Sequence, residues 1–196
     1  MLNVQSITLV GKLVRLEPLK IEHVEELLAI AQDQDIWTYM PTNPSLSLAG
    51  MRTWIATALS NQEAGIELPF AIRDLTSGHL CGSTRYLAIV PQDRGLEIGY
   101  TWLSASARRT GINTECKYLL LRHAFEMLGA IRVQLKTDSR NLRSQKAIER
   151  IGAVREGTLR NHKILPNGYY RHSAYFSVIE SEWPGVKENL LKLMER

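Results

Sequence analysis

Three strand-like segments followed by a long amphipathic helix constrain the fold of this chain more than any other feature. Residues 68–74, 80–86 and 96–103 have strand character and are separated by short turns, which is typical of consecutive hairpins. Residues 111–128 then repeat apolar side chains at helical spacing. Hairpins that lead into such a helix predict a sheet with helices packed on its faces.

The rest of the chain extends this pattern without a linker, a repeat or a low-complexity tract. Further strands are predicted at 12–17, 131–137, 154–159 and 169–179. Further helices are predicted at 21–31, 46–59, 142–151 and 182–194. Because hairpins are followed by a strand–helix–strand unit, the fold class is α/β (α+β), with a mixed sheet of about seven strands. We predict one domain over residues 1–196.

Composition indicates a soluble globular protein, with 44% hydrophobic and 22% charged residues. No apolar run reaches the roughly 18 residues of a membrane span, and the first residues do not resemble a signal peptide. The two cysteines, Cys81 and Cys116, stand in apolar surroundings without metal-ligand spacing. Buried reduced thiols are therefore expected, which favours a cytoplasmic location.

Charge is distributed unevenly between the two halves of the chain. Residues 1–98 carry 7 basic and 11 acidic side chains, a net charge of −4, whereas residues 99–196 carry 17 and 9, a net charge of +8. A basic half of this size favours an anionic partner, and solvated helix faces are the alternative.

The segment between the third hairpin strand and the long helix contains two arginines and a glycine. It reads Arg108-Arg109-Thr110-Gly111-Ile112-Asn113. The first turn of a helix presents unpaired backbone N–H groups, which together with the helix dipole form an anion site. Gly111 would let a diphosphate approach the backbone closely, and guanidinium groups bind phosphate oxygens. The alternative is an ordinary strand-to-helix connection in which Gly111 is a turn residue.

This segment resembles the Arg/Gln-x-x-Gly-x-Gly/Ala signature of the GNAT acetyltransferase superfamily. Arg108 and Gly111 match the signature, and Asn113 stands where it has Gly or Ala. The run Thr110-Gly111-Ile112-Asn113-Thr114-Glu115 is similar to the form in the RimL-like branch of ribosomal-protein N-terminal acetyltransferases. Residues 141–153 resemble the Asn-x-x-Ser segment of the family, and residues 160–184 resemble its terminal strands. The resemblance covers nearly the whole chain, from residue 14 onward.

The resemblance implies a mostly antiparallel sheet whose central parallel pair of strands splays apart. Acetyl-CoA, the implied cosubstrate, would place its pantetheine arm in that gap, here between residues 99–103 and 134–137. Backbone N–H groups near residues 100–103 would also stabilise the oxyanion of the reaction. The residues assigned in this way to acetyl-CoA are Tyr100, Thr101, Trp102, Leu103, Arg108, Arg109, Thr110, Gly111, Ile112, Asn113, Thr114, Asn141 and Ser144.

The implied reaction is direct acetyl transfer to a primary amine, which must be neutral in order to attack. A general base is therefore useful, and Glu97 is the candidate because it lies in the strand that leads to the arginine-containing loop. Apolar Leu96 and Ile98 flank it, and burial there would raise its pKa, with water able to carry the proton. The alternative is a glutamate that faces solvent or pairs with Arg85 or Arg94.

The departing CoA thiolate would benefit from a hydrogen-bond donor. In the RimL-like branch the serine of the Asn-x-x-Ser segment is the implied donor, which makes Ser144 the second candidate catalytic residue. Asn141 would contact the pantetheine. Both residues also stand at a predicted helix start, where N-capping is their ordinary role. Tyr100 and Tyr118 are reserve donors.

The five histidines show no metal-ligand spacing, and no metal is expected. Metallohydrolase and serine-hydrolase motifs are also absent from the sequence. His162 and His172 stand ten residues apart on the final hairpin, where they could line an acceptor mouth. A surface or core role is the alternative for each.

Two functional alternatives and the identity of the acceptor stay open from the sequence. A non-catalytic acyl-CoA-binding regulatory module would keep the arginine-containing loop but lack the chemistry. Nucleic-acid binding is not expected, because aromatic residues make up 7% and no binding motif occurs. The acceptor is a protein N-terminus or a small amine, and the net charge of −4 in the first half hints at a cationic one. A homodimer is possible, since such dimers are the commonest assembly.

Overall fold

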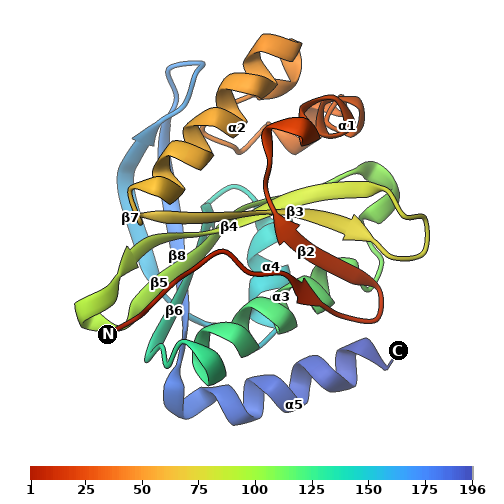
Figure 1. Cartoon of the computed structure of the whole chain (residues 1–196). Coiled ribbons are helices and arrows are strands. Elements are labelled where there is room, and N and C mark those ends of the chain that lie inside the picture. The colour runs from red at the N-terminus through yellow and green to blue at the C-terminus, as the bar shows by residue number, and fades with distance from the viewer. Residues whose placement is uncertain (196) are drawn as a thin grey trace.

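An eight-stranded sheet forms the centre of the computed structural model, which describes residues 1–195 (Figure 1). The strands lie in the order β1-β2-β3-β4-β5-β6-β8-β7, and within the described residues only β5 and β6 are parallel neighbours. The strands are β1 (Leu9–Val10), β2 (Val14–Pro18), β3 (Glu67–Asp74), β4 (Leu80–Val90), β5 (Gly95–Leu103), β6 (Arg132–Asp138), β7 (Val154–Ile164) and β8 (Tyr170–Ile179). The mixed, mostly antiparallel sheet predicted from the sequence is therefore confirmed.

Helices cover both faces of this sheet (Figure 1). One face carries α1 and α2, and the other carries α3, α4 and α5. The α-helices are α1 (Val24–Ile30), α2 (Leu48–Glu63), α3 (Ile112–Arg122), α4 (Leu142–Arg150) and α5 (Trp183–Met194). The shorter helical segments are η1 (Ile21–His23), η2 (Gln34–Ile36), η3 (Pro44–Leu46), η4 (Pro91–Asp93), η5 (Ala105–Ala107), η6 (His123–Met127) and η7 (Glu180–Glu182).

The apolar side chains of β5 are divided between two cores, because an irregularity between Gly99 and Trp102 changes the face on which even-numbered residues lie. Leu96 and Ile98 of β5 belong to the core beneath α3 and α5. Trp102 of the same strand belongs to the core beneath α1 and α2. Burial of one such side chain contributes about 1.5–3 kcal/mol, so a strand that fills both cores is firmly fixed. β5 thus provides a rigid base for the loop that follows it.

Two predicted helix starts have the capping geometry that their sequence favours. The Ser47 hydroxyl accepts a hydrogen bond from the backbone N–H of Gly50 at 3.0 Å, at the start of α2. The Asn141 side-chain oxygen accepts one from the backbone N–H of Ser144 at 3.0 Å, at the start of α4. Each cap satisfies a donor that the helix itself leaves unpaired.

The long helix predicted at 111–128 is two elements. α3 ends at Arg122, and η6 continues it as a π-type turn, in which the N–H of Leu128 donates to the carbonyl of His123 at 3.0 Å. Just before this turn the hydroxyl of Tyr86 donates to the carbonyl of Leu120 at 2.6 Å. A side chain that bonds to a helix carbonyl in this way disturbs the regular ladder.

Both cysteines are buried and unbonded, as predicted. Burial raises the pKa of the Cys81 thiol to about 12, and burial also raises the pKa of Cys116.

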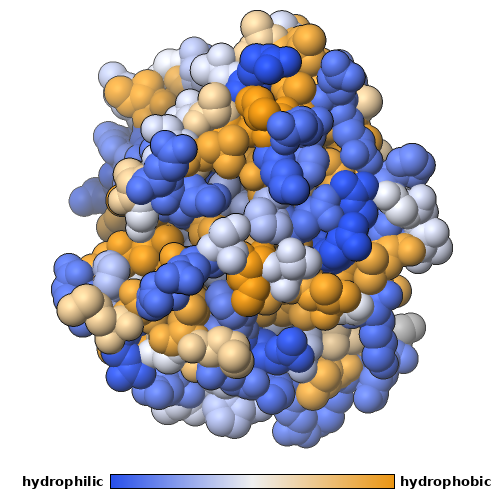
Figure 2. All heavy atoms as spheres, in the orientation of Figure 1, coloured by the Kyte–Doolittle hydropathy of each residue, from blue (hydrophilic) through white to orange (hydrophobic). Residues whose placement is uncertain are grey.

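On the face shown in Figure 2, hydrophilic and hydrophobic residues are interspersed over the surface.

Among residues 1–195, no helix combines the length and the apolar character that crossing a membrane requires.

Candidate functional site

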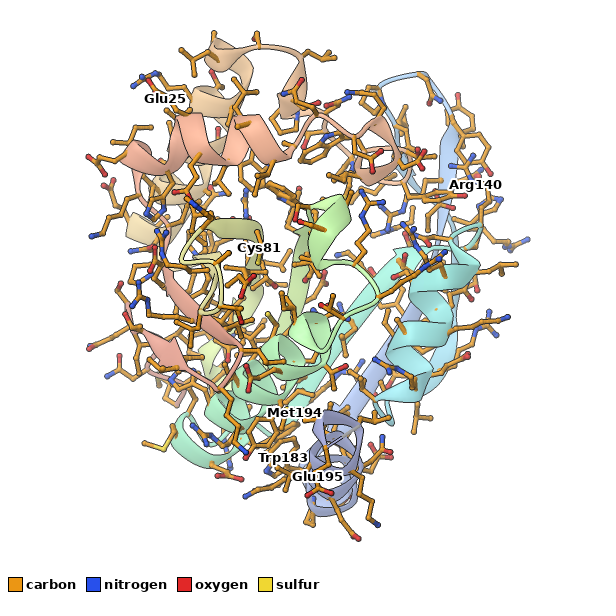
Figure 3. The ribbon with its side chains drawn as sticks, turned by 90° about the vertical axis from the view of Figure 1, so that its right-hand side faces the viewer. Glu25, Cys81, Arg140, Trp183, Met194 and Glu195 are labelled. Carbon is orange, nitrogen blue, oxygen red and sulfur yellow. The ribbon has the colours of Figure 1, made fainter. Side chains whose placement is uncertain are left out.

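The parallel pair β5–β6 is joined over only three residue pairs, the last of which is Glu97 with Gln134. β5 continues to Leu103 and β6 to Asp138, and Figure 3 shows the two strands diverging toward these ends. The backbone groups on the facing edges of the two strands therefore border a gap. On β6 this gap begins at residue 135, one residue later than predicted.

β5 contains a bulge just beyond the point of separation. Its pairing with β4 shifts between Gly99 and Trp102, so that Tyr100 and Thr101 together oppose a single residue of β4. Tyr100 has a φ of 48°, a left-handed conformation that non-glycine residues seldom adopt. Bulges change the direction of backbone groups, and this bulge lies where the sequence predicts N–H donors for the pantetheine arm.

The side chains of the predicted cofactor strand point to opposite faces of the sheet. Tyr100 and Trp102 lie on the α1–α2 face, where the Trp102 ring centroid is 5.4 Å from that of Trp37. Leu103 packs into the core beneath α3. The contacts that residues 100–103 could make to pantetheine are therefore contacts of their backbone.

Thr101 contacts a lysine that sequence patterning missed. Lys117 of α3 is 6% exposed, and its Nζ donates to Oγ1 of Thr101 at 2.8 Å. The Oγ1 atoms of Thr101 and Thr84 are also 2.8 Å apart. Burial lowers the pKa of Lys117 to about 8. The sequence signal was its position: Leu120 and Leu121 follow it at helical spacing, which marks the buried side of α3.

The two arginines of the predicted phosphate loop have different surroundings. Arg108 pairs with Asp33, and its Nε donates to the carbonyl of Leu103 at 3.2 Å. The backbone N–H of Asp35 and then Arg108 lower the pKa of Asp33. Arg109 is exposed, with a left-handed φ of 62°, and pairs with no carboxylate among residues 1–195. Arg109 is therefore the freer of the two to bind an anion.

Thr110 and Gly111, which lie between Arg109 and α3, form a tight turn. The Thr110 hydroxyl donates to the carbonyl of Ala107 at 2.7 Å and accepts from the backbone N–H of Ile112 at 3.3 Å. Gly111 has an ordinary helical φ of −68°, so conformational freedom is not what it provides. A Cβ at this position would lie 2.8 Å from Cδ1 of Leu13. Gly111 therefore provides space beside Leu13.

The first turn of α3 is held from two sides. Thr114 is buried, and its Oγ1 accepts from Nη2 of Arg150 on α4 at 2.8 Å. Glu115 is also buried, and its carboxylate accepts the backbone N–H groups of residues 12–14 at distances between 2.7 and 2.8 Å. Asn113, between these and the loop, is partly exposed. The helix start that is predicted to bind phosphate is thus rigidly placed.

Glu97, the predicted general base, is 2% exposed. Its Oε2 accepts hydrogen bonds from Nε2 of Gln134 and Nζ of Lys136, both at 2.8 Å. The alternatives considered above, solvent exposure or a pair with Arg85 or Arg94, are wrong. Because β6 is the parallel neighbour of β5, Gln134 and Lys136 lie on the same face as Glu97. Glu97 borders the point at which the strands separate.

Ser144, the predicted donor to sulfur, lies in the first turn of α4, which Asn141 caps. Within residues 1–195 its hydroxyl makes no hydrogen bond, so it can serve as a donor. Tyr118, a reserve donor, is partly exposed on α3, and the Arg122 guanidinium lies 5.5 Å from its ring centroid. No hydrogen bond in the described part of the chain joins Ser144 to Glu97.

The two histidines of the final hairpin have separate roles. His162 lies within hydrogen-bond distance of the Ser173 hydroxyl (2.9 Å) and the Tyr175 hydroxyl (3.2 Å). His172 accepts from the backbone N–H of Asn161 at 2.8 Å. Burial lowers the pKa of His162. Both line an open hollow on the β7–β8 hairpin, and no metal-ligating cluster occurs among the described residues.

Comparisons of the sequence and the structure with known proteins identify the family of this chain. A family model described as an acetyltransferase (GNAT) domain matches residues 14–154. A candidate acetyltransferase from T. thermophilus is 37% identical, with a TM-score of 0.87 and a match over 98% of each chain. A GCN5-related N-acetyltransferase from Brucella melitensis is 30% identical, with a TM-score of 0.90 over 96% of this chain and 86% of its own.

A more distant structure has the same fold. RimJ from Mycobacterium smegmatis, solved in complex with CoA-disulfide, is 19% identical, with a TM-score of 0.82 over 95% of this chain and 94% of its own. No curated protein sequence matches the chain. The family model spans more than half of the chain, and the two structures above agree with it over nearly its full length. The chain therefore belongs to the GNAT acetyltransferase family and is an acyltransferase.

Proposed function

We propose that this enzyme uses acetyl-CoA to acetylate a primary amine directly, and that its acceptor is a protein N-terminal α-amine of the RimL-like kind. The observation that carries the proposal is the separation of β5 from β6 immediately before the loop that contains Arg108 and Arg109. A pantetheine arm fits between strand edges whose backbone groups are unpaired, and a diphosphate fits the start of α3. The fold shared with RimJ, solved with CoA-disulfide, supports the same choice.

Binding would divide between the loop and the strand edge. Arg109, together with the backbone N–H groups at the start of α3, would hold the phosphates. The N–H groups of the β5 bulge at Tyr100 would hold the pantetheine arm. Bound there, acetyl-CoA supplies a thioester that an amine can attack. Asn141 would contact the arm from the start of α4.

The chemistry assigned to this chain is proton transfer and charge stabilisation. As the new C–N bond forms and the C–S bond breaks, Glu97 takes the proton of the amine, directly or through water. Backbone N–H groups near Tyr100 stabilise the charge on the carbonyl oxygen, and the removal of one such donor in other enzymes costs about 3 kcal/mol. Ser144 gives its proton to the departing sulfur and regains one from water.

The test is an acetyl-transfer assay with purified protein, acetyl-CoA and a panel of amines. The panel contains peptides with free N-termini, the same peptides with blocked N-termini, and polyamines. Release of the free CoA thiol gives the rate, and mass spectrometry identifies the acetylated amine. Free N-terminal peptides are expected to react and blocked ones are not.

Other outcomes separate the alternatives. Transfer to polyamines but not to peptides would retain the reaction and reject the RimL-like acceptor. Tight binding of acetyl-CoA without transfer to any amine would contradict the proposal and favour a non-catalytic acyl-CoA-binding module.

A further inference from the structure

Buried hydrogen-bond donors without an acceptor gather between the sheet and the α1–α2 layer. They are Nε1 of Trp54, Nε1 of Trp102, Nε and Nη2 of Arg85, and Nε of Arg171. The one other such atom in the described part of the chain is an acceptor, Oε1 of Gln62. Folded proteins leave few buried polar atoms unpaired. An excess of donors in one layer therefore indicates an acceptor group that this chain does not itself provide.

Two arginines, Arg85 and Arg171, provide three of these unpaired donors, and Arg85 is held rigidly. Arg85 of β4 is 3% exposed, and its Nη1 donates to Glu67 at 2.8 Å. Its Cζ lies 4.2 Å from the Trp54 ring centroid and 4.6 Å from the Tyr100 ring centroid. The ion pair and the two aromatic contacts together restrict how far the guanidinium can turn.

The second arginine has no counter-ion. Arg171 of β8 is 6% exposed, and its Nη1 donates to the backbone carbonyl of Tyr39, in the connection between α1 and α2, at 3.1 Å. No carboxylate among residues 1–195 lies within 4.0 Å of it. A buried guanidinium with one hydrogen bond and no carboxylate has capacity for an anionic partner.

Three other cations on this side of the sheet are already paired with carboxylates. They are Arg85 with Glu67, Lys136 with Glu97, and Arg140 with Asp138. Figure 3 shows Arg140 between the start of α4 and the β7–β8 hairpin. Arg171 differs from these three because it has no carboxylate partner among residues 1–195.

This donor cluster borders the proposed base. Arg85 pairs with Gly99 across β4 and β5, and Oε1 of Glu97 lies 2.9 Å from the position that a Cβ of Gly99 would occupy. Burial lowers the pKa of Arg171, and the nearby charges of Asp138 and Glu97 oppose that effect. Arg85, Arg171 and Glu97 therefore lie near one another on the α1–α2 face of the sheet.

We infer that the acceptor amine carries a carboxylate, which Arg85 and Arg171 bind beside Glu97. The inference rests on the proposed function and narrows its acceptor. It also runs against the cationic acceptor suggested by the charge of the first half, because the local donors are cationic. The carboxylate belongs either to a free amino acid or to an acidic side chain next to a peptide N-terminus.

The experiment compares acceptors with and without this carboxylate, and each kcat/KM is referred to the concentration of neutral amine because the amide lowers the amine pKa. One arm measures kcat/KM for serine and serinamide, and the other for the peptide amides Ser-Asp-Ala and Ser-Asn-Ala. Wild-type enzyme is expected to prefer the carboxylate-bearing member of one pair by about tenfold or more, as for other buried charged hydrogen bonds. The pair that shows the preference identifies whether the carboxylate belongs to a free amino acid or to an acidic side chain of a peptide.

Variants then locate the preference. R171Q is expected to lose most of it, and R171K to retain part. R132Q is the matched control, because Arg132 is already paired with Glu156, and it should retain the full preference. The wild-type comparison does not depend on whether R171Q folds.

Three outcomes overturn the inference. Equal rates within both pairs, or an unchanged preference in folded R171Q, would reject the inference but not the proposed function. Transfer to benzylamine with none to the four acceptors would reject the inference and the RimL-like acceptor, but it would retain acetyl transfer to an amine. Transfer to no amine at all would reject the proposed function and the inference together.

Discussion

The Nζ atom of Lys117 donates a 2.8 Å hydrogen bond to Oγ1 of Thr101, which joins the buried side of α3 to the bulged part of β5. Thr101 in turn contacts Thr84 on β4. No carboxylate within residues 1–195 pairs with Lys117, although it is almost fully buried. The hydrogen bond from Lys117 therefore connects β5, whose edge is proposed to bind pantetheine, to α3, whose start is proposed to bind phosphate. The ammonium group of Lys117 is costly to bury.

Lys117→Met is expected to stabilise the protein near neutral pH. The amine titrates near 10.5 in the unfolded chain and near 8 in the folded protein because of its burial. Its burial cost is full below about pH 8 and is relieved as the pH rises from 8 to 10.5. That shift corresponds to at most about 3 kcal/mol. Urea unfolding at pH 7 and pH 10 should show an advantage of the variant that shrinks at the higher pH. A variant less stable than wild type at pH 7 would contradict this explanation.

Glu115→Gln is expected to destabilise the protein by about 3 kcal/mol, because one amide oxygen cannot replace a carboxylate that accepts three backbone N–H groups. Glu149→Gln is the control, since Glu149 is exposed on α4. Denaturant midpoints of the two variants measure the difference. Equal midpoints would mean that these hydrogen bonds do not hold β2 to α3.

Glu97→Gln is expected to lower kcat by about 10²–10⁴-fold, the range of general-base catalysis. The dissociation constant of acetyl-CoA should stay unchanged, because the proposed phosphate contacts lie elsewhere. Steady-state kinetics and a binding titration on the same preparation test both statements. Turnover at the wild-type level would remove Glu97 from the mechanism.

Ser144→Ala and Asn141→Ala separate chemistry from capping. The cap uses the Asn141 side chain and the backbone N–H of Ser144, so Ser144→Ala should lower kcat without lowering the melting temperature. Asn141→Ala should cost about 1 kcal/mol of stability. Thermal melts and kinetics on both variants check this. A Ser144→Ala enzyme with full turnover would leave the reserve donors, Tyr100 and Tyr118, to be tested.

The sequence predicted elements that have many residues and a clear period, such as β5 and α2, and it predicted the fold class. It did not predict β1, because two residues carry no period, or the end of α3 at Arg122. The apolar pattern of that helix continues through the π-type turn. Local patterns report which side of an element is apolar, but they do not report how its hydrogen bonds shift.

Contacts between residues that are far apart in the chain also could not be predicted from the sequence. Glu97 was singled out, but its partner Lys136 is 39 residues away on the neighbouring strand. From the sequence, Arg85 stood out only as an alternative partner of Glu97, and Arg171 was not singled out. Their significance appears only when β4 and β8 place them on one face, beneath residues of α2 and the α1–α2 connection.

The central claim is that acetyl-CoA binds at the start of α3 and between β5 and β6. Thermal melts with acetyl-CoA, with ATP and NADH as anionic controls, test it most directly. At 100 times its dissociation constant a specific ligand adds about 2.7 kcal/mol, a rise of roughly 5–11 °C for a chain of this size. The account predicts that rise with acetyl-CoA alone and a smaller rise in Arg109→Ala. Arg52→Ala, which changes an exposed arginine of α2, should behave like wild type. No rise with millimolar acetyl-CoA, or equal rises with all three ligands, would contradict it.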